Sequence, residues 1–139
     1  MPLLASSLMV ASAAVMLFLG SVHLLYTFRG TKLHPRDPAL RERMEAVSPG
    51  ITRQTTMWKA WVGFNASHSA SAMLFGLVYG HLAIVQAPML FASAFLLGVG
   101  GVFLVGFVVL GKKYWFSIPY RGILLAAGCY GGALAAWFA

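Results

Sequence analysis

The sequence predicts an all-α integral membrane protein, a bundle of four transmembrane helices with one short amphipathic helix between the first two. Three observations predict this fold. Of the 139 residues, 60% are hydrophobic and only 9% are charged, whereas a soluble domain carries roughly 25% charged residues. Four apolar runs are long enough to cross the roughly 30 Å hydrocarbon core of a bilayer. Every basic residue lies in a connection between these runs or at an edge of one. We therefore expect a single transmembrane domain over residues 1–139.

The first predicted span covers residues 3–26. It ends just before Arg29 and Gly30, where the first charge and a helix-ending glycine arrive together. This run lacks the basic segment that begins a secretory signal and is longer than the apolar part of one, so we expect it to be retained. A polar linker at 29–56 follows, and the second span covers 57–85.

The remaining two spans are predicted at residues 89–110 and 118–138, with a tight uncharged turn at 86–88. Both spans are rich in glycine, and small residues let transmembrane helices approach closely. We therefore expect the third and fourth spans to pack against each other. The glycines on which this rests are Gly98, Gly100, Gly101, Gly106, Gly122, Gly128, Gly131 and Gly132.

The linker at 29–56 contains signals for a short helix. Asp37 followed by Pro38 is typical of a helix start, and Ser-Pro-Gly at 48–50 is typical of a stop. We expect this helix to lie in the cytoplasmic interface with its apolar side toward lipid; a simple connector resting on the headgroups is the alternative. The apolar residues at helical spacing are Leu40, Met44 and Val47.

The distribution of the ten basic residues predicts the orientation of the chain. The second connection and both ends carry none, so the positive-inside rule places the first and third linkers in the cytoplasm and both termini outside. We expect contacts with the lipid bilayer and with anionic lipid at the cytoplasmic face, and no nucleic-acid partner. Seven basic residues belong to the first connection or its edge and three to the third: Arg29, Lys32, Arg36, Arg41, Arg43, Arg53 and Lys59, then Lys112, Lys113 and Arg121.

Polar residues inside a span are expensive and tend to face the bundle interior. In the second span Trp61, Asn65 and His68 recur at intervals of three and four, which places them on one stripe of a helix. His23 and Asn65 each lie six residues from the nearest basic residue on antiparallel spans. We therefore expect these two side chains in one layer, with His68 one turn deeper. His34 and His81 lie near opposite interfaces, where a histidine needs no special role.

Several interpretations of this polar set stay open. The side chains could hydrogen-bond each other only to hold helices together, or His23, Trp61, Asn65 and His68 could bind a hydrophobic or redox ligand such as haem, quinone or lipid. The chain could also be an accessory subunit of a larger membrane complex, or form a homo-oligomer. Since no Asp or Glu occurs in any span, carboxylate-driven ion transport is disfavoured. No nucleophile pairs with a histidine in a defensible geometry, so the pattern does not decide whether the protein is an enzyme.

The stretch at residues 57–69, MWKAWVGFNASHS, contains the motif W-x-G-F-N-x-S-H-S. It resembles a motif of small bacterial four-span membrane proteins of uncharacterised function. The segments GSVH at 20–23 and TKLHP at 31–35 are similar but less specific. The resemblance covers about the first half of the chain. It implies a bacterial inner membrane location and supports a role for His23, Asn65 and His68, without implying a reaction or a ligand.

Overall fold

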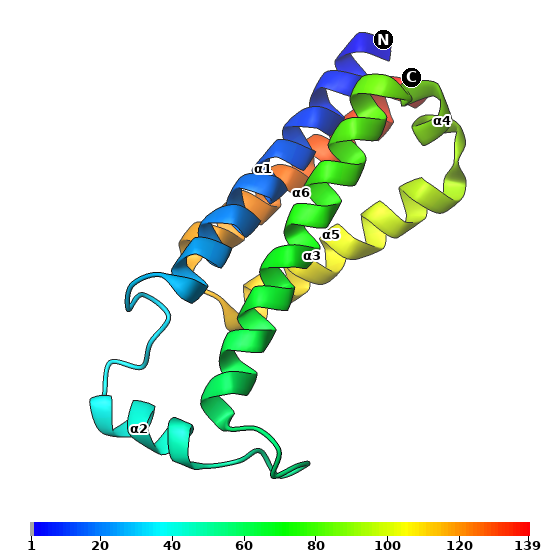
Figure 1. Ribbon diagram of the computed structural model, residues 1–139. Coiled ribbons are helices and arrows are strands. Elements are labelled where there is room, and N and C mark those ends of the chain that lie inside the picture. The colour runs from blue at the N-terminus through cyan, green and yellow to red at the C-terminus, as the bar shows by residue number, and fades with distance from the viewer. Residues whose placement is uncertain (1) are drawn as a thin grey trace. The chain divides into compact units, whose positions relative to one another are not determined.

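The computed structural model describes residues 2–139, and over that range the chain is all α-helical, with no β-strand (Figure 1). Four of the six helices, α1, α3, α5 and α6, are long and apolar enough to cross a membrane. The predicted all-α fold, with four candidate spans and a short helix after the first, is therefore confirmed. The helices are α1 (Pro2–Phe28), α2 (Pro38–Ala46), α3 (Met57–Val85), α4 (Ala87–Ala92), α5 (Ala94–Tyr114) and α6 (Ser117–Phe138).

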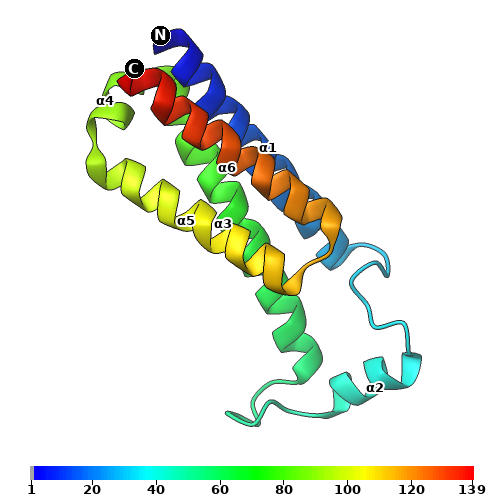
Figure 2. The same ribbon diagram turned by 180° about the vertical axis from the view of Figure 1, so that it is seen from behind.

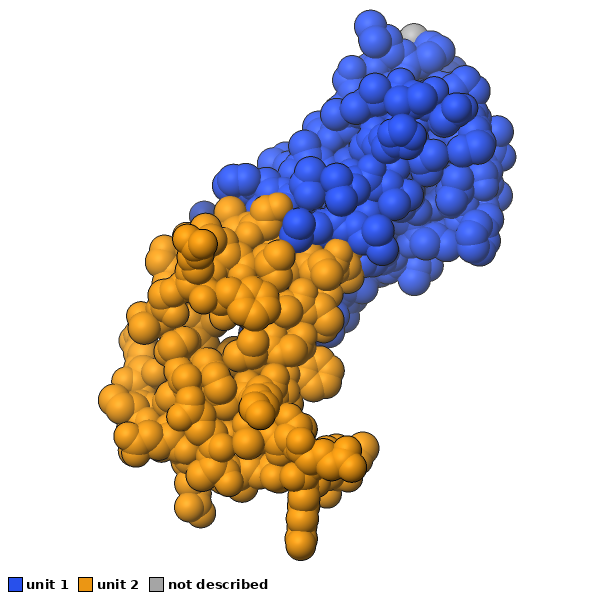
Figure 3. Space-filling model, viewed as in Figure 1, with its two compact units in different colours: residues 1–19, 72–139 blue, residues 20–71 orange. Residues whose placement is uncertain are grey.

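The chain divides into two compact units, which Figure 3 shows in different colours. Unit 1 comprises residues 1–19 and 72–139, and unit 2 comprises residues 20–71. Helices α1 and α3 each contribute to both, whereas α5 and α6 belong to unit 1 and α2 to unit 2. All the buried hydrophobic side chains found in residues 2–139 lie in unit 1. The single transmembrane domain stays a prediction.

The linker helix α2 begins where its local signals predict. Asp37 is its N-cap, and its carboxylate Oδ1 accepts a hydrogen bond of 2.9 Å from the backbone N–H of Ala39. Pro38 occupies the first turn, where its missing N–H costs nothing. The helix ends at Ala46, just before the predicted stop. Upstream, α1 ends at Phe28 and Gly30 adopts φ 78°, a conformation that favours glycine.

The predicted start of the third span was wrong. We expected a turn at 86–88 and a span from residue 89, but residues 87–92 form the separate helix α4 and the long helix α5 begins only at Ala94. Pro88 lies in the first turn of α4, where proline is compatible with a helix. Ser93 separates the two helices. It is the N-cap of α5, because its Oγ accepts a hydrogen bond of 3.2 Å from the N–H of Leu96. Helix α5 also extends to Tyr114, beyond the predicted end at 110.

Two tyrosines tie other helices of unit 1 to α5. The hydroxyl of Tyr79 in α3 donates to the carbonyl of Leu96, and the hydroxyl of Tyr130 in α6 donates to that of Leu97 at 2.6 Å. Buried hydroxyls need such partners in an apolar environment. Helices α5 and α6 pack against each other, as predicted, and are joined by the short connection after Tyr114 (Figure 2).

The glycine-based reason for that packing was only partly right. A Cβ added at Gly98, Gly106 or Gly128 would meet no atom within 4 Å, so these glycines do not make close contacts. The tightest approach is instead between α3 and α1, where a Cβ on Gly76 would lie 2.6 Å from the Ala13 carbonyl oxygen. Close packing therefore depends on α1 and α3 as well as on α5 and α6.

Candidate functional site

The predicted polar side chains meet in unit 2, between the last turns of α1 and the first turns of α3. The Nε2 atom of His23 lies 3.0 Å from Oδ1 of Asn65. The rings of His23 and His68 are in edge-to-face contact, with centroids 5.1 Å apart and an interplanar angle of 81°. The expected neighbourhood of these three residues is thereby confirmed, whereas ligand binding by them stays a prediction.

The hydrogen bonds of Asn65 determine how His23 is protonated when neutral. The Asn65 side-chain Nδ2 donates to the backbone carbonyl of Trp61 at 2.8 Å, so its Oδ1 faces His23. Because an amide oxygen only accepts, Nε2 of His23 carries the proton and donates to it. The other ring nitrogen, Nδ1, is then the acceptor of the neutral imidazole.

Hydroxyl side chains on the same two helices bind the backbone carbonyls of the three polar residues. Ser69 Oγ donates to the Asn65 carbonyl, Ser71 Oγ to the His68 carbonyl and Thr27 Oγ1 to the His23 carbonyl, each at 2.8 Å. Such bonds from residues three or four positions later satisfy the hydroxyls within the helix. The spacing of three or four residues in the sequence is the signal that could have predicted these bonds. Because the hydroxyls are engaged within their helices, the imidazole and amide groups supply the chemistry of the site.

Trp61 belongs to the site through its backbone, while its indole contacts the linker. Its carbonyl accepts from Asn65, and its indole Nε1 donates to the carbonyl of Leu33 at 3.0 Å. The side chain is 42% exposed. Ligand binding by Trp61 stays a prediction; its contacts link the segment near Leu33 to the helix that carries Asn65 and His68.

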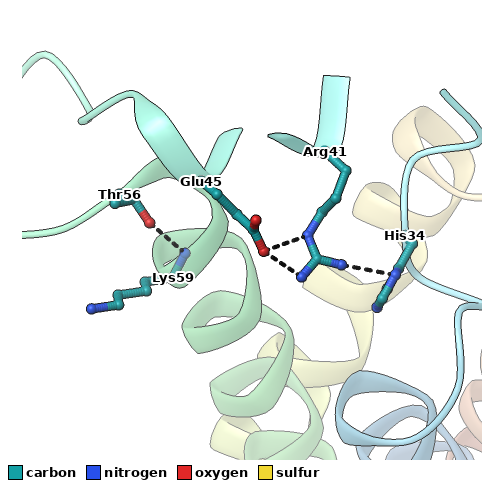
Figure 4. A network of polar contacts seen from close by, with 5 residues as sticks. All are labelled: His34, Arg41, Glu45, Thr56 and Lys59. Carbon is teal, nitrogen blue, oxygen red and sulfur yellow. Dashed lines mark hydrogen bonds and ion pairs between the residues drawn. The ribbon is translucent and has the colours of Figure 1, made fainter. Parts of the chain in front are cut away.

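A second set of polar contacts surrounds Arg41 of α2, and Figure 4 draws its bonds to Glu45 and His34. Arg41 donates from Nε to Glu45 at 3.0 Å, and its Nη1 lies 2.9 Å from Nδ1 of His34. Because a guanidinium has no acceptor, His34 Nδ1 is the acceptor. The guanidinium carbon also lies 3.6 Å from the ring centroid of Trp58, and the His34 ring meets the same indole edge-on at 4.9 Å. The position of His34 near an interface indicated no special role for it, but its contacts with Arg41 and Trp58 help to dock the linker.

We expect Arg41→Gln to loosen the linker without unfolding the protein. The change removes a cation–π contact and the charge-assisted bond to Glu45, which together contribute about 1–2 kcal/mol at a partly exposed position. Hydrogen exchange of the backbone at 31–46 should therefore become faster. Glu42→Gln is the matched control, because no partner of the exposed Glu42 side chain, on the same helix, is found among residues 2–139. Equal exchange rates in the two variants would contradict the assigned docking role.

The geometry of the two histidines does not fit haem held between them. Metal–imidazole bonds are about 2 Å long, so two rings on opposite sides of one iron would have centroids roughly 6 Å apart, with the porphyrin between them. The 5.1 Å edge contact of His23 and His68 is shorter than that, and Nε2 of His23 already donates to Asn65. Across residues 2–139 no group of three or more histidine, cysteine, aspartate or glutamate side chains is arranged to hold a metal ion.

No protein-family model, curated protein or solved structure matches this chain. The class of protein is therefore defined by its own fold and side chains. It is an all-α protein with four candidate membrane spans, in which His23, Asn65 and His68 form a polar cluster where α1 and α3 meet. The resemblance of its motif to small bacterial four-span proteins stays a prediction.

Proposed function

We propose that this protein binds a small hydrophobic ligand with a polar head group, a quinone or a lipid, at His23, Trp61, Asn65 and His68. We place it in a bacterial inner membrane, with both termini outside and the first and third linkers in the cytoplasm. The observation that carries the proposal is the contact of two imidazoles and one amide inside segments that are otherwise apolar enough to span a bilayer.

The number of polar groups supports ligand binding over simple packing. One interhelical hydrogen bond, such as that between His23 and Asn65, is enough to hold two helices together and contributes about 0.6–2 kcal/mol. His68 adds a third polar side chain beside this pair, half-buried and with its ring against His23. Because each additional polar group in a span carries a cost, we propose that His68 also recognises the polar head group of the ligand.

The protonation of His23 supports one kind of head group. With Nε2 donating to Asn65, the remaining nitrogen of neutral His23 is an acceptor and suits a ligand hydroxyl. A quinol or a hydroxyl-bearing lipid supplies such a group, and the His68 ring lies against that of His23. The Asn65 amide keeps one N–H and one oxygen lone pair beyond its bonds to Trp61 and His23, and these can serve a ligand.

The test is to purify the protein gently from native membranes and to analyse an organic extract by mass spectrometry. We expect one lipid-soluble compound at near-stoichiometric amount, largely lost from His68→Leu and His23→Leu protein. His81→Leu is the matched control, because His81 lies exposed on the same helix as His68. Identical extracts from all four folded proteins would refute the proposal. An absorption spectrum of the same sample should show no Soret band from a haem held by the two histidines.

The alternative function, an accessory subunit of a larger complex, is favoured by one feature of unit 1. One open face of α5 is apolar and is formed by Phe95, Val99 and Val102, among others. Phe95 and Val102 are 76% and 75% exposed, as expected of a surface covered by lipid or by another helix. Co-purification with other subunits in mild detergent would support this alternative, whereas a small monodisperse particle carrying ligand would favour the first proposal.

A further inference from the structure

Helix α2 has two sides with different surroundings. Arg41 and Glu45, four residues apart, lie on the side that docks onto Trp58. Leu40 and Arg43, three residues apart, lie on a different stripe of α2, well over a quarter-turn away, and the C-cap Val47 follows four residues after Arg43. Leu40 and Val47 are 49% and 40% exposed, and Arg43 is exposed as well. The docking of Arg41 therefore turns this stripe away from α3.

The segments flanking α2 continue the same mixture of cationic and apolar side chains. Ile51, in the turn that follows the helix, is 93% exposed, and Arg36 and Arg53 are exposed on either side of α2. No hydrogen bond or ion pair of the Arg36, Arg43 or Arg53 side chains is found among residues 2–139. We call Arg36, Leu40, Arg43, Val47, Ile51 and Arg53 the linker face.

The charge of this region is strongly positive. From Arg29 to Lys59 the chain carries seven basic and three acidic residues, a net charge of 7 − 3 = +4. The acidic side chains are partly committed, since Asp37 caps α2 and Glu45 pairs with Arg41. The exposed arginines of the linker face are therefore those left to meet an external anion.

The length of α3 brings the end of α2 to the level of lipid headgroups. Helix α3 has 29 residues, which at about 1.5 Å per residue is about 43 Å. A bilayer with its headgroup regions is about 40–45 Å thick. The first residue of α3, Met57, donates its backbone N–H to the carbonyl of Val47 at 2.8 Å. When α3 spans a bilayer, this bond holds the C-cap of α2 at the headgroup layer.

We propose that the linker face binds the anionic headgroups of the bilayer in which the chain is embedded, with the apolar side chain of Ile51 entering the interface. The guanidinium groups of Arg36, Arg43 and Arg53 suit phosphate, to which arginine donates two parallel hydrogen bonds. The linker is attached at both ends to candidate spans, α1 and α3, so the bilayer is the anionic surface always within reach. Exposed apolar residues among arginines are typical of segments that lie in a membrane interface.

The experiment reports the surroundings of residue 51 directly. In full-length protein with Cys129→Ala, Ile51→Cys is labelled with the environment-sensitive dye NBD, and the protein is placed in nanodiscs. One preparation contains phosphatidylcholine alone and the other also contains phosphatidylglycerol. We expect brighter, blue-shifted emission in the anionic nanodiscs, and loss of that shift at high salt, because screening weakens exposed charge interactions.

Two sets of variants distinguish binding by the linker face from a general effect of positive charge. Combining Arg36→Gln, Arg43→Gln and Arg53→Gln should abolish the dependence on phosphatidylglycerol. Lys112→Gln with Lys113→Gln, a change at the end of α5, should leave it intact. Water-like emission in both nanodiscs would overturn the proposal, and so would emission that changes only when a soluble protein or nucleic acid is added. The comparison of two lipids on one labelled protein requires no variant of the arginines, so misfolding of the triple variant cannot obscure it.

Discussion

Gly76→Ala is expected to destabilise unit 1 by about 1–3 kcal/mol, the range for inserting a group into a packed site. A Cβ at this position of α3 would lie 2.6 Å from the carbonyl oxygen of Ala13 and 2.6 Å from Cβ of Leu17, both on α1. These are backbone or backbone-proximal atoms that cannot rotate away. The added methyl group must therefore push α1 and α3 apart and disturb the contacts on either side.

The matched control for this change lies one turn away on the same helix. A Cβ on Gly80 would meet the Ala13 Cβ at 3.5 Å, an ordinary contact, so Gly80→Ala should be neutral or slightly stabilising because alanine favours a helix. Unfolding of purified protein with a denaturing detergent, followed by circular dichroism, measures both. Equal midpoints for Gly76→Ala and Gly80→Ala would contradict the close α1–α3 approach.

Gly100→Ala is expected to destabilise unit 1 by about 2–4 kcal/mol, because it combines overpacking with weakened hydrogen bonds. A Cβ on Gly100 would lie 2.7 Å from the Tyr130 hydroxyl oxygen and 2.7 Å from ring atoms of Tyr79. Each of these hydroxyls donates to a carbonyl of α5. Moving the rings to make room would lengthen both bonds and disturb the stack of Tyr79 on Phe75, whose centroids are 4.4 Å apart.

The neighbouring glycine supplies the control for Gly100→Ala. The nearest atom to a Cβ on Gly101 is Cε1 of Tyr130, at 4.0 Å, so Gly101→Ala should leave stability nearly unchanged. The same denaturation measurement distinguishes the two variants. If Gly101→Ala were the more destabilising, the assigned position of the two tyrosines on α5 would be incorrect.

The variants at Gly76 and Gly100 distinguish loss of ligand caused by unfolding from loss of ligand caused by removal of a binding side chain. Gly76 and Gly100 lie in unit 1, whereas His23, Asn65 and His68 lie in unit 2. A variant at either glycine that loses ligand together with its helical signal would report unfolding. His68→Leu is expected to lose ligand while its denaturation midpoint stays close to that of the unchanged protein, since His68 is outside the buried hydrophobic core.

Much of the architecture followed from the sequence because its signals are local. Apolar runs separated by charged connections predict spanning helices whatever their neighbours, and the Asp37–Pro38 pair predicts the start of α2 by its own capping chemistry. The layer of His23 and Asn65 was also predictable, because equal distances from the nearest charges on antiparallel helices place residues at equal depth. The helical rise per residue and the order of the spans were therefore sufficient to predict that these polar residues lie close together.

The tertiary structure decided what depends on how each helix is rotated and on residues far apart in the chain. Composition could not distinguish Gly76, pressed against α1, from Gly98, which faces open space. It could not show that Ser93 separates α4 from α5, because the turn signal at Pro88 is equally compatible with a helix start. The indole of Trp61 binds Leu33, 28 residues away, and Arg41 stacks on Trp58. The sequence by itself determined the four long apolar helices, the start of α2 and the shared layer of His23 and Asn65. Only the packed chain determined the break between α4 and α5 and the side chains that each residue meets.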